Sequence, residues 1–183
     1  MPFKKKYTEE DISWLRENYN TGYIWADGCF RKDCNTYNMD LVIQIDDGLA
    51  IKSLLEKIGA FKITERQSVG RRKGVMKFTN RNKGFCRMLA ENEFLTKSYS
   101  EPTKLLSNIP KEFHCYWLRG LVDGDGCVTV SNRTKSLTIS GQYIYEWDEC
   151  GNIFAGLGVK STIHRKKSKT GDASIIGVYS YFG

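Results

Sequence analysis

Two stretches of the chain, Gly22-Tyr-Ile-Trp-Ala-Asp-Gly-Cys-Phe30 and Gly120-Leu-Val-Asp-Gly-Asp-Gly-Cys-Val128, are copies of one pattern. They stand 98 residues apart, and in each copy a Gly is followed four residues later by a small residue and then by Asp-Gly-Cys. A sequence duplication of this kind predicts two related structural units within one chain.

The elements expected after each copy follow the same order of hairpin, helix and hairpin, with the copy itself on a helix. Hydrophobic periodicity and turn residues predict strands at 29–36, 39–46, 61–67 and 74–79 around a helix at 49–58 in the first half. In the second half they predict strands at 127–131, 136–141, 159–167 and 173–181 around a helix at 145–157. A leading helix is expected to begin near Thr8, and a further helix at 81–90. The expected domains are residues 1–91 and 114–183, joined by a linker at 92–113.

The composition favours a globular protein with a polyanionic partner. The 183 residues include 28 Lys and Arg against 21 Asp and Glu, a net charge of +7, and 13% of the residues are aromatic. No segment approaches the ~20 apolar residues of a membrane span, and no secretory signal opens the chain, so we expect an intracellular protein without a membrane partner. Six cysteines without a C-x-x-C pair indicate reduced thiols rather than a zinc site.

Small residues four positions apart lie on one face of a helix, where they let a second helix approach closely. These residues are Gly22 and Ala26 in the first copy and Gly120 and Gly124 in the second. We expect the two helices to pack on each other through these faces. Because each helix ends in Asp-Gly, their packing would place Asp27 beside Asp125.

A pair of carboxylates at two helix C-termini is unfavourable, because each faces the negative end of a helix dipole and the other negative charge. A divalent cation relieves both effects, and oxygen ligands open to water and phosphate favour Mg²⁺ over zinc. Carboxylates that hold metal ions are a common device for phosphodiester hydrolysis. A single Asp-Gly is usually only a turn. Two copies in register on matching helices instead favour a metal site.

The segment Leu118-Arg-Gly-Leu-Val-Asp-Gly-Asp-Gly126 resembles the signature nonapeptide of the LAGLIDADG homing endonucleases, and Asn20-Thr-Gly-Tyr-Ile-Trp-Ala-Asp-Gly28 resembles a more divergent copy. The resemblance covers nearly the whole chain and points to the monomeric, two-motif branch. It implies an α+β fold of two αββαββ(α) halves related by a pseudo-two-fold axis. The motif helices would pack at the centre, and two antiparallel four-stranded sheets would form a DNA-binding saddle.

The same resemblance implies a site-specific endonuclease of the intron-homing type. Such an enzyme cuts both strands of a long pseudo-palindromic or asymmetric target and leaves short 3′ overhangs. It uses Mg²⁺, Mn²⁺ can replace Mg²⁺, and Ca²⁺ supports binding without cleavage. The expected compartment is the cytoplasm of a bacterium or phage-infected cell, or an organelle. The alternative on the same fold is a nucleic-acid-binding protein that does not cut, either an RNA maturase that assists intron splicing or a DNA-binding regulator.

By resemblance, Asp27 and Asp125 supply the metal-binding acids, with Gly28 and Gly126 beside them. Gln44 and Lys77 match the residues that help to position the attacking water. Their counterparts in the second half are expected to be Ser140 and Ser180, so the two sites should be chemically unequal. Trp25 stands in the first motif where the second has Asp123, which we expect to be structural.

Polar residues along the expected strands and turns suit the two tasks of DNA binding. Arg, Asn and Gln can pair with base edges, and Lys-rich turns can contact phosphates. For any single residue, a solvated surface is the alternative. The expected DNA-binding residues are Arg31, Lys32, Asn35, Asn38, Asp40, Arg66, Arg71, Arg72, Lys73, Asn132, Arg133, Lys135, Thr138, Gln142, Arg165, Lys166, Lys167 and Lys169.

Overall fold

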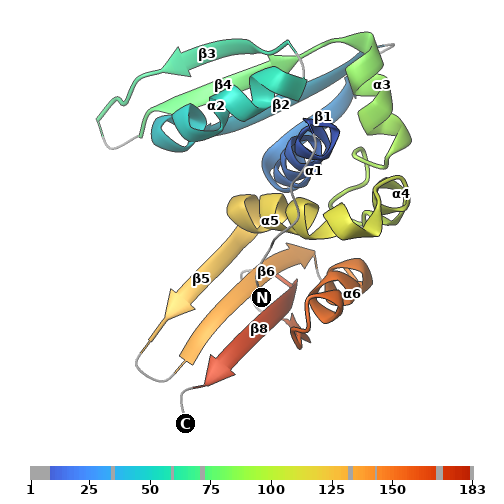
Figure 1. The fold of residues 1–183 in the computed structure, drawn as a ribbon. Helices are drawn as coiled ribbons and strands as arrows, with labels where there is room; N and C mark the ends of the chain where they lie inside the picture. The colour runs from blue at the N-terminus through green and yellow to red at the C-terminus, as the bar shows by residue number, and fades with distance from the viewer. Residues whose placement is uncertain are drawn as a thin grey trace.

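The chain folds into two similar halves that meet along a central pair of helices, as Figure 1 shows. This computed structural model describes residues 9–33, 36–58, 60–70, 73–131, 134–142, 144–167 and 171–181. In the first half the elements are α1 (Glu9–Asp27), β1 (Gly28–Asp33), β2 (Thr36–Gln44), α2 (Ile45–Ile58), β3 (Lys62–Arg66), β4 (Val75–Asn80) and α3 (Lys83–Glu91). None of the described helices is long and apolar enough to cross a lipid bilayer.

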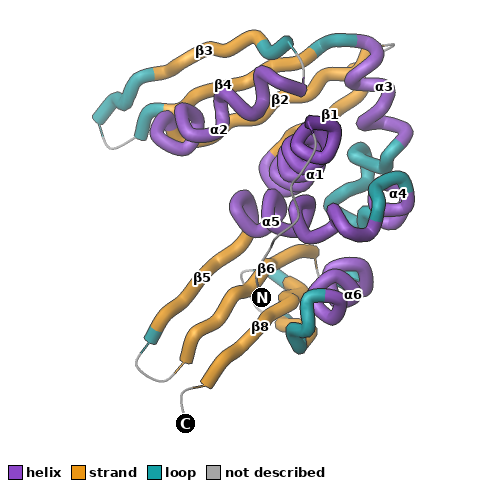
Figure 2. The backbone as a smooth tube through the Cα atoms, viewed as in Figure 1, coloured by secondary structure: helices purple, strands orange, loops and turns teal. Residues whose placement is uncertain are grey.

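The second half repeats the order of the first. Its elements are α5 (His114–Asp125), β5 (Gly126–Val130), β6 (Thr134–Gln142), α6 (Asp148–Gly156), β7 (Thr162–Lys166) and β8 (Ala173–Tyr181). The predicted α+β architecture, with two antiparallel four-stranded sheets and central motif helices, is confirmed. Figure 2 shows how the sheets diverge from the helices at the centre.

The two sheets have the same strand order, β1-β2-β4-β3 and β5-β6-β8-β7. Their registers also agree, because Gln44 lies opposite Val75 and Gln142 lies opposite Ala173. These positions differ by the same 98 residues that separate the two sequence motifs. The duplication seen in the sequence therefore extends to individual strand positions.

Each sheet buries one face against helices and leaves the other open. In the first sheet Met39 and Leu41 of β2 and Met76 and Phe78 of β4 are fully buried. Side chains alternate between the faces of a strand, so their sequence neighbours point the other way. We call the side opposite the buried residues the open face. In the second sheet Ile139 and Ile176 mark the buried face.

The leading helix and the first motif helix are one continuous helix of 19 residues. The helix expected from residue 145 begins later, at Asp148. The backbone N–H of Tyr145 donates to the carbonyl of Gln142, and Trp147 adopts a left-handed φ of 69°. The buried Trp147 indole donates to the Ser174 hydroxyl at 2.8 Å. This hydrogen bond fixes the turn onto the sheet and delays the helix.

The segment expected as a linker, 92–113, is packed against the central helices. It contains α4 (Thr103–Ser107) and a short 3-10 helix, η1 (Lys111–Phe113). The Phe94 ring is buried and meets the Trp25 ring edge-on at 4.9 Å between centroids. At its end, Nε2 of His114 lies 2.8 Å from the Ile109 carbonyl oxygen. The segment therefore belongs to the core between the two halves.

Candidate functional site

The central helices α1 and α5 approach each other through the predicted small residues. A Cβ atom built on Gly22 would overlap the carbonyl oxygen of Trp117, and one built on Gly120 would overlap that of Tyr19. One turn further along, a Cβ on Gly124 would collide with the side chain of Ala26. Only glycine permits this backbone-to-backbone contact. The expected packing of the motif helices is therefore confirmed.

The close packing brings together the acids that end the two helices, Asp27 on α1 and Asp125 on α5. A Cβ on Gly124 would lie 3.6 Å from Oδ2 of Asp27, so this carboxylate stands directly beside the last turn of α5. Partial burial at the helix junction raises the pKa of Asp27, and the charge of Asp125 raises it further. Partial burial also raises the pKa of Asp125. The two groups therefore form an acidic pair that favours either protons or a bound cation.

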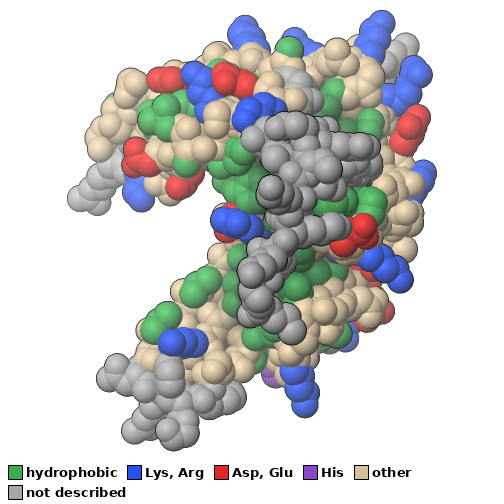
Figure 3. Space-filling model, in the orientation of Figure 1, with side chains coloured by type: hydrophobic (Ala, Val, Ile, Leu, Met, Phe, Trp, Pro, Cys, Tyr) green, Lys and Arg blue, Asp and Glu red, His purple; other side chains and the backbone are tan. Residues whose placement is uncertain are grey.

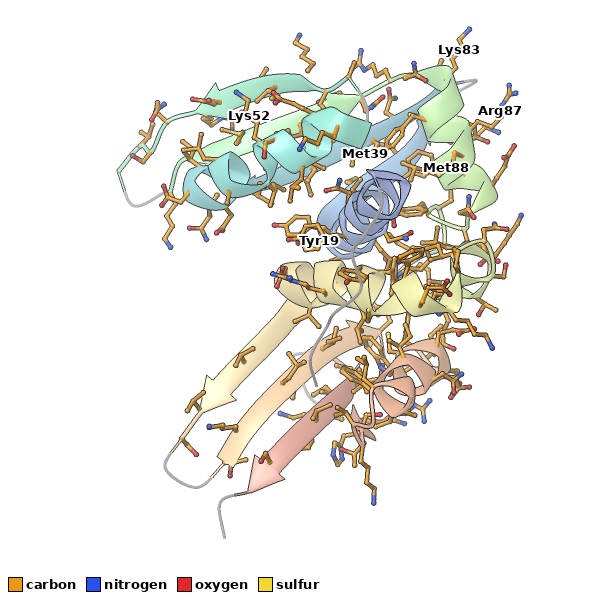
Figure 4. All side chains as sticks on the ribbon, in the orientation of Figure 1. Tyr19, Met39, Lys52, Lys83, Arg87 and Met88 are labelled. Atoms are coloured by element: carbon orange, nitrogen blue, oxygen red, sulfur yellow. The ribbon has the colours of Figure 1, made fainter. Side chains whose placement is uncertain are left out.

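Two tyrosines on α1 hydrogen-bond to acids at the end of the helix pair. The Tyr23 hydroxyl hydrogen-bonds Asp27, and the Tyr19 hydroxyl donates to Oδ2 of Asp123 at 3.0 Å. Burial together with the bond to Asp123 raises the pKa of Tyr19 to about 12. Figure 4 shows Tyr19 on the side of α1 that faces the gap beside α5. Asp123 thus accepts a hydrogen bond across the helix pair.

A hollow flanks the acidic pair on each side. One, of about 500 Å³, is lined by Asp27, Gln44 and Asp47. The other, of about 320 Å³, is lined by Asp125, Gln142 and a lysine of the 92–113 segment. Gln44 and Gln142 occupy equivalent ends of β2 and β6, so each hollow contains one glutamine and the acid that ends a motif helix. We call them the Asp27 hollow and the Asp125 hollow.

The strand register corrects the expected counterparts in the second half. The position equivalent to Gln44 is Gln142, not Ser140, because each lies opposite the first residue of the paired strand. Lys77 lies opposite Val42, and the matching pair in the second sheet is Ser140 with Ile175. The counterpart of Lys77 is therefore Ile175, not Ser180. The halves share the glutamine and differ at the basic residue.

Lys77 lines neither hollow and instead joins an ion-pair cluster on the open face of the first sheet. Its ammonium lies 3.0 Å from Oδ2 of Asp40, and Arg31 donates to the same oxygen at 2.7 Å. Thr79 donates to the other oxygen at 2.8 Å. Burial alone would raise the pKa of Asp40, but these hydrogen bonds and cations lower it. Asp40 thus holds two cations in place on the sheet.

The expected DNA-binding residues are distributed unequally over the described part of the chain. On the open faces, by register, lie Arg31, Asn38, Asp40, Arg66, Thr138, Gln142 and Lys166, together with Lys62, which the sequence reading missed. Lys32, Lys135 and Arg165 lie on the helix-facing side, because they alternate with open-face residues. Lys73 donates to Oε1 of Gln44 at 3.1 Å, and Lys167 follows β7. Asn35, Arg71, Arg72, Asn132, Arg133 and Lys169 lie outside the described residues.

The lysine in the Asp125 hollow, Lys97, was not identified from the sequence. Its ammonium donates to the carbonyl oxygens of Trp25 and, at 2.7 Å, Ala26, in the last turn of α1. Burial lowers the pKa of Lys97, and the charges of Asp125 and Asp27 oppose that shift. No motif or periodicity marks this residue, because it belongs to the segment that follows the first copy of the repeat.

By strand register, Gln44 of the Asp27 hollow and Gln142 of the Asp125 hollow lie on the open faces of their sheets. The space-filling view shows the molecule hollowed between its lobes, where α5 runs into β5 (Figure 3). Within the described residues, no three His, Cys, Asp or Glu side chains form a metal-binding group. A cation held by Asp27 and Asp125 would therefore need further ligands from water or from a bound anionic molecule.

Comparison with protein-family models matches residues 112–180 to the LAGLIDADG-like domain. A comparison with curated protein sequences finds no match.

Comparison with solved structures finds the same fold in several proteins. The crystal structure of I-DmoI in complex with DNA and Ca has a TM-score of 0.60 at 14% identity, over 91% of this chain and 83% of that one. The homing endonuclease I-WcaI bound to its DNA recognition sequence has a TM-score of 0.61 at 16% identity, over 96% and 84%. The N-terminal LAGLIDADG domain of DUF199/WhiA has a TM-score of 0.59 at 12% identity, over 92% and 76%. Other I-DmoI structures are described with DNA and Mn, or with target DNA in the presence of Mg.

Proposed function

We propose that this chain, which belongs to the LAGLIDADG family through the domain formed by residues 112–180, is a site-specific DNA endonuclease that cuts both strands of its target. The observation that carries the proposal is the acidic pair, Asp27 and Asp125. The pair is held together by the close contact of α1 and α5, which requires glycine at the positions where the backbones meet. An acid and a glutamine in each of two hollows provide one reaction centre for each strand.

The donor atoms of the acidic pair fit a hard divalent cation. The pair offers carboxylate oxygens and adjoining backbone carbonyls. The pKa values of both carboxyl groups are raised, and a bound cation would lower them again. Asp27 and Asp125, with the backbone at Gly28 and Gly126, would hold Mg²⁺ or Mn²⁺, and phosphate oxygens of DNA and water would complete the ligands. Such a cation, when bound, polarises the scissile phosphodiester and stabilises the leaving oxygen.

The chain's own residues then have distinct tasks. Gln44 and Gln142 are exposed at equivalent strand ends beside the acids, where each amide can hydrogen-bond the water that attacks the phosphorus. Arg31 and Lys77, fixed by Asp40 on the open face of the first sheet, can contact the DNA backbone or base edges. With Ile175 in place of a second lysine, we expect unequal cleavage rates for the two strands.

Substitution of either acid tests the proposal. Asp27→Asn and Asp125→Asn should each abolish double-strand cleavage in Mg²⁺ while leaving DNA binding in Ca²⁺ within a few-fold of wild type. Asp46→Asn, at an exposed position in the first turn of α2, makes the same charge change outside the pair and should cut normally. Normal cleavage by either variant of the pair would remove the acids from the reaction.

A protein that binds nucleic acid without cutting is the second candidate. The structural match to the N-terminal LAGLIDADG domain of DUF199/WhiA supports it, because the same fold occurs there in a protein other than the two homing endonucleases I-DmoI and I-WcaI. Such a protein would bind DNA, or a host intron RNA, equally well with Asp27 and Asp125 changed to Asn. Binding with no new DNA ends in Mg²⁺ or Mn²⁺ would favour this candidate.

A further inference from the structure

Lys97 brings a cation into one of the two hollows and leaves the other without one among its described lining residues. The Asp125 hollow is lined by Lys97, and the lining of the Asp27 hollow contains neither Lys nor Arg. One acid and one glutamine of each lining are related by the 98-residue repeat, since Asp27 matches Asp125 and Gln44 matches Gln142, whereas Asp47 and Asp123 line only the Asp27 hollow. The two hollows therefore differ in charge in two ways, with a lysine in the Asp125 hollow and two further acids in the Asp27 hollow.

The immediate surroundings of the Lys97 ammonium are those of a cation site. Its partners are the carbonyl oxygens of Trp25 and Ala26. Both lie in the last turn of α1, where no following turn of the helix supplies an N–H group to donate to them. The charges of Asp125 and Asp27 act on the same ammonium. Backbone carbonyl oxygens beside carboxylates at a helix C-terminus are also the ligands that a hard divalent cation prefers.

We propose that the Lys97 ammonium is a built-in counter-ion of the acidic pair, which occupies the Asp125 hollow and weakens divalent-cation binding there. This inference rests on the proposed function, because it concerns the cation that Asp27 and Asp125 would hold. It predicts that the Asp27 hollow binds the metal more tightly than the Asp125 hollow. The alternative role of Lys97 is that of a helix cap alone, which would stabilise α1 without affecting cation binding.

Terbium binding distinguishes these roles without DNA and without cleavage. Tb³⁺ takes oxygen ligands, and its luminescence can be excited through Trp25, which lines the Asp125 hollow. Lys97→Gln keeps a hydrogen-bond donor near the α1 carbonyls and removes the charge. Removing one positive charge a few ångströms from the site should tighten Tb³⁺ binding roughly tenfold. Lys97→Arg keeps the charge and should bind Tb³⁺ as weakly as the wild type.

Two controls separate the local effect from net charge and from folding. Lys104→Gln makes the same charge change at an exposed position on α4 and should leave Tb³⁺ affinity unchanged within about twofold, because solvent screens distant charges. If Lys97→Gln does not fold, Lys97→Met retains the length of the side chain and answers the same question. Unchanged Tb³⁺ affinity in a folded Lys97 variant overturns the inference and leaves Lys97 as a cap.

The Asp27→Asn variant completes the experiment. It should lose most Tb³⁺ binding in the wild-type background and retain weak binding at Asp125 in the Lys97→Gln background, where the ammonium no longer occupies that hollow. If none of the proteins binds Tb³⁺, the metal site of the proposed function fails and the inference fails with it. If the wild type binds Tb³⁺ and the loss of Lys97 makes no difference, only the inference fails.

Discussion

At the scale of single residues, the acidic pair is a local conflict that the fold maintains. Asp27 and Asp125 end two helices that touch. Each carboxylate is partly buried, lies at the negative end of a helix dipole and stands near a second negative charge. The Tyr23 hydrogen bond and the Lys97 charge offset part of this cost at Asp27. Such conflicts are typical of sites that bind a ligand or carry out chemistry.

We predict that Asp27→Asn stabilises the protein in the absence of metal, because the substitution removes one of two neighbouring negative charges. The folded state holds the Asp27 proton more tightly than the unfolded state, because its pKa is raised. Wild-type stability therefore falls as pH rises from the unfolded pKa through the folded pKa, and the Asn variant escapes this loss. We expect the variant's Tm to match the wild type near pH 3 and to exceed it by about 1–3 °C at neutral pH, since solvent screens an exposed pair.

Differential scanning calorimetry in a metal chelator measures both curves, with Asp46→Asn as the matched control. Adding Mn²⁺ should reverse the order, because the wild type gains binding energy that the variant lacks. A variant that is less stable than the wild type at neutral pH without metal would show that Asp27 is a stabilising residue.

At the scale of elements, the contact between α1 and α5 depends on the absence of side chains. A methyl group at Gly120 would overlap the Tyr19 carbonyl, which is backbone and cannot rotate away. Gly120→Ala must therefore separate the helices, with a cost of about 1–3 kcal/mol as for other overpacked cores. Because separation also parts the acids, DNA cleavage should fall by more than the stability loss explains.

Gly156→Ala provides the control for this prediction. Gly156 ends α6, and a Cβ atom there would have no neighbour within 4 Å. Alanine at this position should leave stability equal or slightly higher, because the unfolded chain loses conformational freedom. Urea unfolding of both variants gives the comparison, and equal stability of Gly120→Ala and the wild type would refute close packing of the helices.

The repeat explains why so many elements were predictable from the sequence. Gly22, Gly120 and the two Asp-Gly pairs carry local spacing rules, and the strands follow alternation, so the helix contact and the strand positions needed no tertiary information. The two four-stranded sheets followed from the family resemblance, and the order of strands within them comes from the structure. The late start of α6 could not be predicted, because it depends on the buried hydrogen bond from Trp147 to Ser174.

The missed parts of the candidate site depend on contacts between distant segments. Lys97 reaches the last turn of α1 across more than 70 residues of sequence, and no spacing rule covers such a contact. The true counterpart of Gln44 was predictable from the 98-residue offset alone, which leads to Gln142. Lys32 and Arg165 were expected to bind DNA by composition, whereas strand alternation assigns both to the helix-facing side.

At the scale of the whole molecule, the two open faces differ in charge. Among the described side chains, the first sheet presents Arg31, Lys62, Arg66 and Lys77 on its open face. Among the described open-face side chains of the second sheet, Lys166 is the one lysine or arginine. If the faces bind the two arms of a DNA target, the first sheet provides most of the electrostatic attraction from the strands.

This asymmetry predicts the salt dependence of DNA binding. Lys62→Ala and Arg66→Ala should each weaken binding to any DNA sequence and reduce the slope of log Kobs against log salt by about 0.9 per lost phosphate contact. Lys52→Ala, on α2 and so on the helix side of the same sheet, should leave the slope unchanged. Fluorescence anisotropy over a salt series provides the slopes, and equal slopes for all three variants would contradict contact between this face and DNA.

The most direct test of the proposed endonuclease is to sequence the DNA ends that the protein creates. Wild-type protein and Asp27→Asn are incubated with genomic DNA from relatives of the source organism that lack the gene, in Mg²⁺ and in Ca²⁺. We expect discrete ends at one locus, with a short fixed 3′ overhang, from the wild type in Mg²⁺ only. Protected DNA without new ends in either metal, from wild type and variant alike, would contradict cleavage by the acidic pair and identify a protein that binds DNA without cutting it.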